Sequence, residues 1–163
     1  MLLTDYRNQK GQFDGIASIE MFEAVGEKYW PVYFNSLKNL MKNGAKSTLQ
    51  IITIADEIFP EYRKRVDFIQ KYIFPGGMLP SKKALEKQFL QVGLKSINLK
   101  SFGSSYSKTL RLWHSSFNSV WDDIASVKFD DRFKRMWNFY LASCAAVFYS
   151  KTGDVIQVTL KKS

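Results

Sequence analysis

The stretch Leu49-Gln50-Ile51-Ile52-Thr53-Ile54 decides the fold class of this chain of 163 residues. It is almost continuously apolar and rich in β-branched side chains, which is typical of a strand that is covered on both faces. A second β-favouring run, residues 13–19, lies upstream. Between the two runs, residues 27–41 carry apolar side chains at helical spacing, and Asn43-Gly44 is expected to end that helix. The order strand, helix, strand predicts an α/β fold.

The same alternation continues downstream. Helical spacing of apolar residues predicts helices in 60–74, 81–92, 107–124 and 130–148, and β-favouring runs predict strands in 94–102 and 155–160. Pro75-Gly76-Gly77 ends the first of these helices. Residues 55–80 form an insertion that a minimal α/β unit does not need. We therefore expect a mostly parallel sheet of about four strands with one helical insertion.

The composition favours an anionic partner and excludes several classes of site. Lys and Arg number 24 against 15 Asp and Glu, a net charge of +9, which suits nucleic acid, a phospholipid surface or a phosphorylated ligand. His114 and Cys144 are the single histidine and cysteine, so no internal disulfide and no metal site is expected. Residues 136–150 are the longest uncharged stretch, and a spanning helix needs about 18 or more apolar residues. With no signal peptide recognised, we expect a cytosolic protein.

Four motifs in order carry a family resemblance. They are Phe13-Asp14-Gly15-Ile16 with residues 18–26, residues 71–77 with Leu79-Pro80-Ser81, Phe102-Gly103 with Tyr106, and residues 132–137 leading to Cys144. Together they resemble the cyclopropane-fatty-acyl-phospholipid synthases and the related mycolic acid cyclopropane synthases, which depend on S-adenosylmethionine. The resemblance implies the C-terminal part of a class I methyltransferase (Rossmann-like) sheet. It also implies a single partial domain over residues 1–163, with a helical lid at 55–80 and aromatic-rich helices.

The family's glycine-rich cofactor loop has no counterpart here. None of the nine glycines forms a Gly-x-Gly, and Met1-Leu2-Leu3 looks like the tail of the family's third strand. The acidic residue that should hold the ribose would also lie upstream. We therefore expect the chain alone to bind S-adenosylmethionine very weakly. A missing N-terminal half or a homo-oligomer would complete the fold.

The resemblance implies a catalytic group of Glu23, Gln50, Ile52 and Tyr106 around a bicarbonate ion. In the family, bicarbonate is thought to accept the proton that is lost when the cyclopropane ring closes. Gln50 stands where the family has a histidine, and an amide cannot titrate near neutral pH, which leaves simple methyl transfer open. The alternatives are an acid at a helix N-terminus for Glu23 and core packing for Ile52 and Tyr106.

The resemblance also implies a cofactor-binding group. Asp5 and Tyr6 match the region beside the adenine of S-adenosylmethionine, and Ile19 and Glu20 match the region beside its methionine. An ordinary solvated turn is the alternative in both places. For His114 and Cys144 we expect structural positions, on a partly exposed helix and in a helix core respectively.

The implied activity is transfer of a methyl or methylene group to an unsaturated acyl chain of a phospholipid. The alternative is a truncated or split fragment that is not catalytic without a partner chain. The basic groups Arg63-Lys64-Arg65 and Lys82-Lys83 suit an anionic membrane surface, which would place the protein at the inner membrane face, although a solvated helix face is the default interpretation. Nucleic acid is not expected, because the aromatic residues fall on helix core positions.

Overall fold

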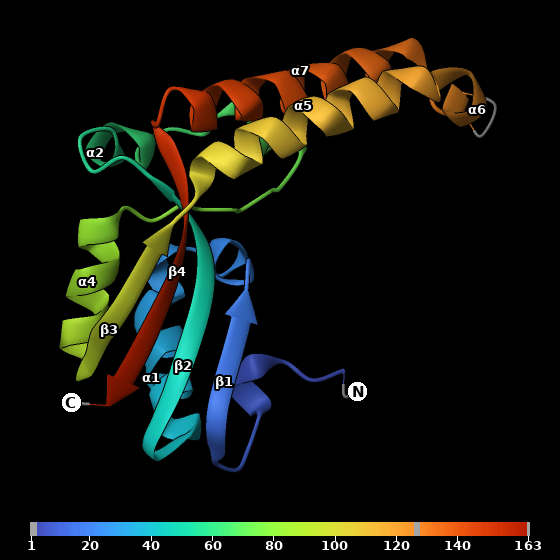
Figure 1. Ribbon diagram of the computed structural model, residues 1–163. Helices are drawn as coiled ribbons and strands as arrows, with labels where there is room; N and C mark the ends of the chain where they lie inside the picture. The colour runs from blue at the N-terminus through green and yellow to red at the C-terminus, as the bar shows by residue number, and fades with distance from the viewer. Residues whose placement is uncertain (1–2, 126–127, 163) are drawn as a thin grey trace. The chain divides into compact units, whose positions relative to one another are not determined.

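The computed structural model describes residues 3–125 and 128–162. Its elements are η1 (Tyr6–Asn8), β1 (Phe13–Ile19), η2 (Phe22–Ala24), η3 (Glu27–Tyr29), α1 (Trp30–Leu40), β2 (Met41–Ile54), α2 (Phe59–Tyr62), α3 (Phe68–Tyr72), α4 (Lys82–Gln91), β3 (Leu94–Ser101), α5 (Gly103–Ser119), α6 (Trp121–Ala125), α7 (Asp131–Tyr149) and β4 (Gly153–Lys162) (Figure 1). Residues 1–2, at the start of the expected third-strand tail, lie outside the described residues. The α/β alternation is confirmed.

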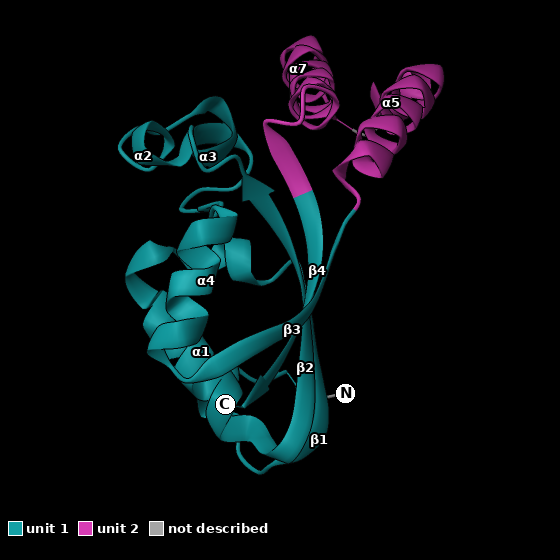
Figure 2. Ribbon diagram, turned by 60° about the vertical axis from the view of Figure 1, so that its left-hand side comes forward, with its two compact units in different colours: residues 1–101, 155–163 teal, residues 102–154 magenta. Residues whose placement is uncertain are grey.

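The described elements fall into two compact units, each considered by itself. Unit 1 consists of Met1–Ser101 and Val155–Ser163, and unit 2 of Phe102–Asp154 (Figure 2). The expected single partial domain over residues 1–163 stays a prediction, and within it the chain forms these two units. Unit 1 holds the sheet and the insertion, and unit 2 holds the long helices α5 and α7.

The sheet of unit 1 has four strands in the order β1-β2-β4-β3. Strands β1 and β2 are parallel, whereas β3 and β4 are antiparallel. Side-chain hydrogen bonds join Thr48 to Thr159 and Gln50 to Gln157, so β4 also runs against β2 (Figure 1). Three of the four strands, β1, β2 and β3, therefore run in one direction, so the expectation of a mostly parallel sheet holds for every strand except β4. Because Ser101 at the end of β3 pairs with Ile156 near the start of β4, the chain re-enters the sheet at the end where it left, and such a connection makes an antiparallel pair.

Strand β2 is longer than the predicted run 49–54. Helix α1 ends at Leu40, and Asn43-Gly44 lie inside β2 instead of ending the helix. Asn43 and Gly44 lie in a β-bulge, because Phe13 pairs with Met41 while Gly15 pairs with Lys46. Gly44 has a φ of +79°, a conformation that favours glycine. This half of the strand was missed because it lacks a continuous apolar run: exposed polar residues separate its buried positions Met41, Ala45 and Ser47.

The predicted helix 60–74 is two short helices, α2 and α3, separated by residues 63–67. Asp67 is the N-cap of α3. Its carboxylate accepts a hydrogen bond from the Gln70 N–H at 2.8 Å, and the Gln70 side chain accepts one from the Asp67 N–H at 3.0 Å. This capping box starts a new helix within a segment whose apolar spacing reads as continuous.

The core of unit 1 lies between the sheet and helices α1 and α4, which cover one face of the sheet (Figure 2). Helix α4 begins where the sequence predicts, because the Ser81 side chain caps it, and Gly93 follows it at a φ of +67°. The largest side chains of this core that are fully buried are Phe22, Trp30, Phe34, Met41, Leu49, Ile51, Leu85, Leu94, Ile156 and Leu160.

Unit 2 is a pair of packed helices, α5 and α7, with the short α6 between them in the chain. The buried Ser107 hydroxyl of α5 donates a hydrogen bond to the Ala145 carbonyl of α7 at 2.9 Å. Asp130 caps α7, as predicted, whereas the predicted helix 107–124 is divided between α5 and α6. Among the described residues, no helix is long and apolar enough to cross a membrane.

Candidate functional site

The candidate site lies where β1 leaves the edge of β2. The last backbone hydrogen bond between the two strands runs from the Glu20 N–H to the Gln50 carbonyl, at 2.9 Å. Glu20 has a φ of +51°, in the left-handed region that a residue with a side chain rarely adopts, and there the chain turns away from the sheet. The edge of β2 beyond Gln50 therefore needs other partners.

Two other segments supply those partners. The Glu23 carboxylate accepts a hydrogen bond at 2.5 Å, through Oε1, from the Ile52 N–H. Two residues further on, the Ile54 N–H donates to the Pro80 carbonyl at 2.9 Å, in the loop that follows α3. A buried backbone N–H without a partner would cost stability, so Glu23 has a structural role in ending the ladder.

The loop after α3 approaches Glu23 closely. The Met78 N–H donates to the Glu23 carbonyl at 2.8 Å. A Cβ added at Gly77 would come within 3.0 Å of the Phe74 carbonyl oxygen and 3.8 Å of the Glu23 carbonyl oxygen. The motif Pro75-Gly76-Gly77 therefore lets the insertion pack against the segment that carries the candidate carboxylate.

The second carboxylate oxygen of Glu23 has no such partner. Oε2 is buried and makes no hydrogen bond with any described residue. Burial raises the pKa of the Glu23 carboxyl above its usual range, and the Ile52 N–H opposes that shift. Oε2 is thus free to accept a hydrogen bond from a donor such as the hydroxyl of bicarbonate, and a protonated carboxyl could donate one to an anion. The alternative, a simple acid at a helix N-terminus, leaves this buried oxygen unexplained.

Gln50 lies on the same strand but is held by two neighbours. Its Nε2 donates to Glu20 Oε1 at 2.9 Å, and its Oε1 accepts from Gln157 Nε2 at 2.9 Å. The structure thus joins Glu20, expected in the cofactor-binding group, to Gln50, expected in the catalytic group, and adds Gln157 of β4. Sequence reasoning missed Gln157, although it is the one amide within the apolar run of the last strand.

The other two predicted catalytic residues are placed differently. Ile52 meets Glu23 through its backbone N–H, and its side chain is half-buried. Tyr106 lies on α5 in unit 2, where its ring packs against Phe102 and Phe148 with centroid distances of 5.9 and 5.4 Å. Its meeting with Glu23 stays a prediction, because the two residues belong to different units.

The predicted cofactor residues lie near β1 and η1. Ile19, at the end of β1, is 69% exposed. The Tyr6 ring packs edge-on against Tyr33 at 5.5 Å, and the Tyr33 hydroxyl donates to Ser18 Oγ at 2.7 Å. Burial raises the pKa of Tyr33 to about 12. The Tyr6 ring could pack against the flat adenine, and the exposed Ile19 could contact the methionine part, which are the places that the family resemblance implies for them.

Asp5 is less suited to a ligand than its neighbour Tyr6. Both of its oxygens accept from the Arg7 guanidinium, at 2.9 and 2.7 Å, and Oδ1 also accepts from the Arg7 N–H at 2.9 Å. These contacts lower the pKa of Asp5 to about 2. The carboxylate therefore caps η1, and contact with a ribose or adenine would have to compete with Arg7.

Comparison with known proteins places these features in a family. The model of the family described as mycolic acid cyclopropane synthetase matches residues 1–158. The chain is 42% identical over 159 residues to the tuberculostearic acid methyltransferase UfaA1 of Mycobacterium tuberculosis, covering 97% of this chain and 37% of that protein. It is 35% identical over 164 residues to the cyclopropane-fatty-acyl-phospholipid synthase of Escherichia coli K12, covering 99% of this chain and 41% of that protein.

Solved structures confirm the fold. Mycolic acid cyclopropane synthase CmaA1, complexed with SAH and CTAB, superposes with a TM-score of 0.88 at 26% identity, covering 99% of this chain and 59% of that one. Cyclopropane synthase MmaA2 of Mycobacterium tuberculosis gives a TM-score of 0.88 at 24% identity, again covering 99% of this chain and 59% of that one. The chain therefore spans about two-fifths of the curated relatives named above. The match of the family model over nearly all of its residues shows that the chain belongs to the mycolic acid cyclopropane synthetase family.

Proposed function

We propose that the chain forms the catalytic edge of an S-adenosylmethionine-dependent methyltransferase that acts on an unsaturated acyl chain of a lipid. The observation that carries the proposal is the Glu23 carboxyl, with one oxygen on the Ile52 N–H and the other buried without a partner among the described residues. The family and the names of its relatives supply the substrate class.

S-adenosylmethionine would supply a sulfonium methyl group, and Tyr6, Ile19 and Glu20 are the residues offered to hold it. The methyl group would pass from sulfur to one alkene carbon, which would release S-adenosylhomocysteine and leave a cation on the acyl chain. Loss of a proton from the transferred methyl group would close a cyclopropane ring, whereas loss from a neighbouring chain carbon would leave a methyl-branched alkene. Glu23 would hold the bicarbonate that takes this proton, through a hydrogen bond at Oε2. Tyr106 is expected to donate its hydroxyl to the same anion.

The chemistry and the hydrogen bonds of the Gln50 side chain favour a methyl-branched product over a cyclopropane ring. An amide cannot take up or release a proton near neutral pH, and here it is fixed between Glu20 and Gln157. The family resemblance places a histidine at this position. UfaA1, whose name describes a methyltransferase, is 42% identical to this chain. We therefore propose methyl transfer as the main reaction, with cyclopropane formation as the alternative.

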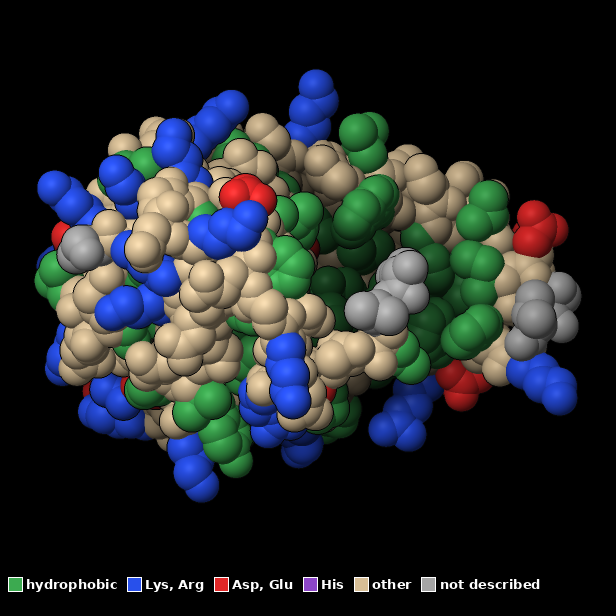
Figure 3. All heavy atoms as spheres, turned by 90° about the horizontal axis from the view of Figure 1, so that it is seen from below, with side chains coloured by type: hydrophobic (Ala, Val, Ile, Leu, Met, Phe, Trp, Pro, Cys, Tyr) green, Lys and Arg blue, Asp and Glu red, His purple; other side chains and the backbone are tan. Residues whose placement is uncertain are grey.

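A cytoplasmic location with peripheral contact to the inner membrane face belongs to the same proposal. Its support is the net charge of +9 and the exposed Val66, which follows Arg65 in the chain. Two of the predicted basic residues are already paired, Arg63 with Glu27 and Lys64 with Glu61. On the face seen in Figure 3, Lys and Arg side chains are dispersed and form no single patch. These observations favour a diffuse attraction to anionic lipid.

The test is product analysis with a complete enzyme that contains this chain, S-adenosylmethionine and phospholipids that carry cis-unsaturated chains. Gas chromatography with mass spectrometry separates methyl-branched from cyclopropane products. We expect the branched product, and a slower rate in Glu23→Gln and Tyr106→Phe with unchanged folding. Glu86→Gln on α4 and Tyr72→Phe on α3 are the matched controls. In Gln50→His we expect a larger share of cyclopropane, and an unchanged share would refute the role given to the amide.

The alternative, a fragment that needs a partner chain, is favoured by the fact that the chain covers 37–41% of its curated relatives. Calorimetry of the chain with S-adenosylmethionine separates the two proposals. Binding together with product formation supports an active chain. Absence of both, with a folded protein by circular dichroism, supports the partner-dependent fragment.

A further inference from the structure

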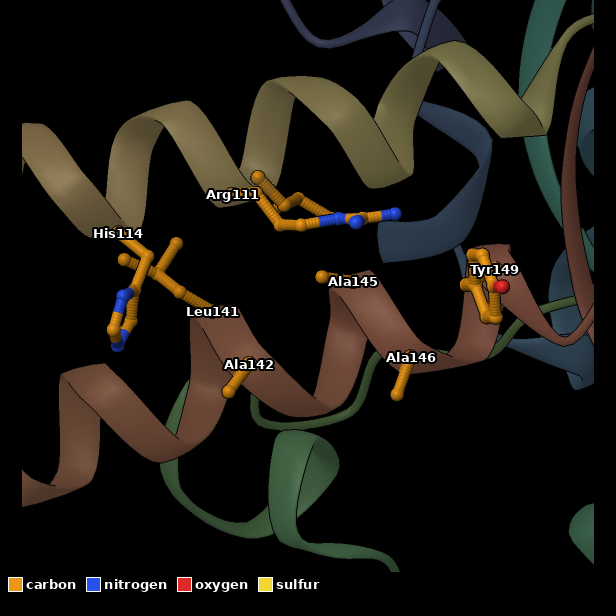
Figure 4. A pocket seen from close by; sticks show the side chains of 8 residues that line it. Arg111, His114, Leu141, Ala142, Ala145, Ala146 and Tyr149 are labelled. Carbon is orange, nitrogen blue, oxygen red and sulfur yellow. The ribbon is translucent and has the colours of Figure 1, made fainter.

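Unit 2 contains a cavity that the proposed reaction does not use. It lies between α5 and α7, has a volume of about 370 Å³, and is shown in Figure 4. Its lining residues are Leu110, Arg111, His114, Leu141, Ala142, Ala145, Ala146 and Tyr149. The volume falls in the range of small-ligand sites, about 300–1,000 Å³. Tyr106 is not among the lining residues.

The shape of the cavity follows from the side chains that line it. The alanines of α7 are short, so the two helices leave a hollow along Leu110 and Leu141. The lining positions on α7, from Leu141 to Tyr149, extend over about 12 Å at 1.5 Å per residue. The hollow is therefore a mainly apolar groove whose length along α7 suits part of one alkyl chain.

The polar groups of the groove are basic or aromatic. The Arg111 guanidinium lies 5.3 Å from the centre of the Tyr149 ring, and it donates to the Ser107 hydroxyl at 3.2 Å. These contacts hold the guanidinium at the groove, beside Tyr149 (Figure 4). No ion pair to Arg111 is found among the described residues. His114 lines the same groove. An apolar floor with an unneutralised guanidinium at its rim complements a single alkyl chain that ends in an anion.

We propose that this groove binds a single-chain fatty carboxylate, with the carboxylate on Arg111 and the chain over Ala142, Ala145 and Ala146. A guanidinium pairs with a carboxylate through two parallel hydrogen bonds, which fixes the direction of the chain. The groove has room for one chain, which favours a free fatty acid over a two-chain phospholipid. This inference does not depend on the methyl transfer proposed above.

The test uses the full chain, labelled with ¹³C at the alanine methyl groups, and dodecanoate below its micellar concentration. We expect dodecanoate to shift the methyl signals of Ala142, Ala145 and Ala146 and to leave that of Ala24 in unit 1 unchanged. Arg111→Ala should weaken binding by about tenfold, since it removes a charge-assisted pair. Arg135→Ala, an exposed arginine of α7 that does not line the groove, is the matched control.

A second variant tests the groove without changing its charge. Ala146→Leu, at an exposed position, should fill the hollow and abolish the shifts at Ala142 and Ala145. The proposal is overturned if Arg111→Ala binds dodecanoate as tightly as the parent, or if dodecyltrimethylammonium shifts the same methyl signals equally. It is also overturned if only vesicles of anionic phospholipid, and not dodecanoate, produce the shifts.

Discussion

The Glu23 carboxylate takes the place of a strand carbonyl for Ile52. Its Oε1 accepts the Ile52 N–H at 2.5 Å, two residues beyond Gln50, the last residue of β2 that pairs with β1. A side chain that completes a sheet edge and also carries a buried, unpartnered oxygen links the fold to the proposed chemistry. The same carboxyl therefore affects stability and reactivity, and the two can be separated by the choice of substitution.

Glu23→Leu and Glu23→Gln separate these roles. Both remove the charge, but glutamine keeps a carbonyl oxygen for the Ile52 N–H and leucine does not. We expect Glu23→Leu to be less stable than Glu23→Gln by about 1–3 kcal/mol, the cost of a buried donor left without a partner. Urea unfolding followed by circular dichroism measures the difference. Equal stability of the two variants would show that the Ile52 hydrogen bond contributes little.

The raised pKa of Glu23 predicts a pH dependence. The unfolded chain ionises this group near its ordinary value of 4.5, whereas the folded chain resists ionisation. Between the ordinary pKa and the raised folded pKa the unfolded state therefore binds fewer protons, so the stability of the parent falls as pH rises. We expect Glu23→Gln to gain stability relative to the parent as pH rises above 4.5, the ordinary pKa of the group. Glu86→Gln is the control, and a difference independent of pH would contradict the prediction.

Tyr33 predicts a second pH effect, at alkaline pH. Its pKa is raised from 10.0 to about 12 by burial, so the unfolded chain loses this proton first and stability falls as pH rises through that range. Ultraviolet titration should show late ionisation from Tyr33, and Tyr33→Phe should remove that contribution. Tyr72→Phe, at a side chain that is 50% exposed, is the control. Loss of the late signal in the control alone would rule out the assignment.

Local sequence signals predicted much of this structure. Ser81 and Asp130 act as N-caps, and the runs around Leu49 and Val155 form strands, because each signal acts over a few residues. The bulge at Gly44 and the reversed direction of β4 could not be predicted in this way. Both features depend on which strand pairs with the segment, and the residues of one segment do not specify its partner strand.

In the candidate site, too, some residues could be predicted from the sequence, whereas others depend on how the strands pair. The family resemblance selected Glu23, Gln50 and Ile52 together, and the structure joins Ile52 to Glu23 through a backbone hydrogen bond. Ile52 meets Glu23 through its backbone N–H because β1 turns away from β2 at Glu20 and leaves that N–H without a partner on β1. The residues around Ile52 do not specify where β1 ends. Gln157 is 107 positions from Gln50, and only the pairing of β4 with β2 brings the two amides together.

The last prediction concerns the outer edge of β1. In the order β1-β2-β4-β3, β1 pairs only with β2 among the described residues, and Ile19 at its end is 69% exposed. An apolar edge strand without a second neighbour recruits other chains, and an added lysine discourages this pairing. We expect the purified chain to self-associate in light scattering, and Ile19→Lys to shift it toward the monomer. Val66→Lys, at a residue that is 74% exposed and outside the sheet, is the matched control and should leave association unchanged. A parent chain that stays monomeric at high concentration, or equal dissociation in both variants, would exclude association through this edge.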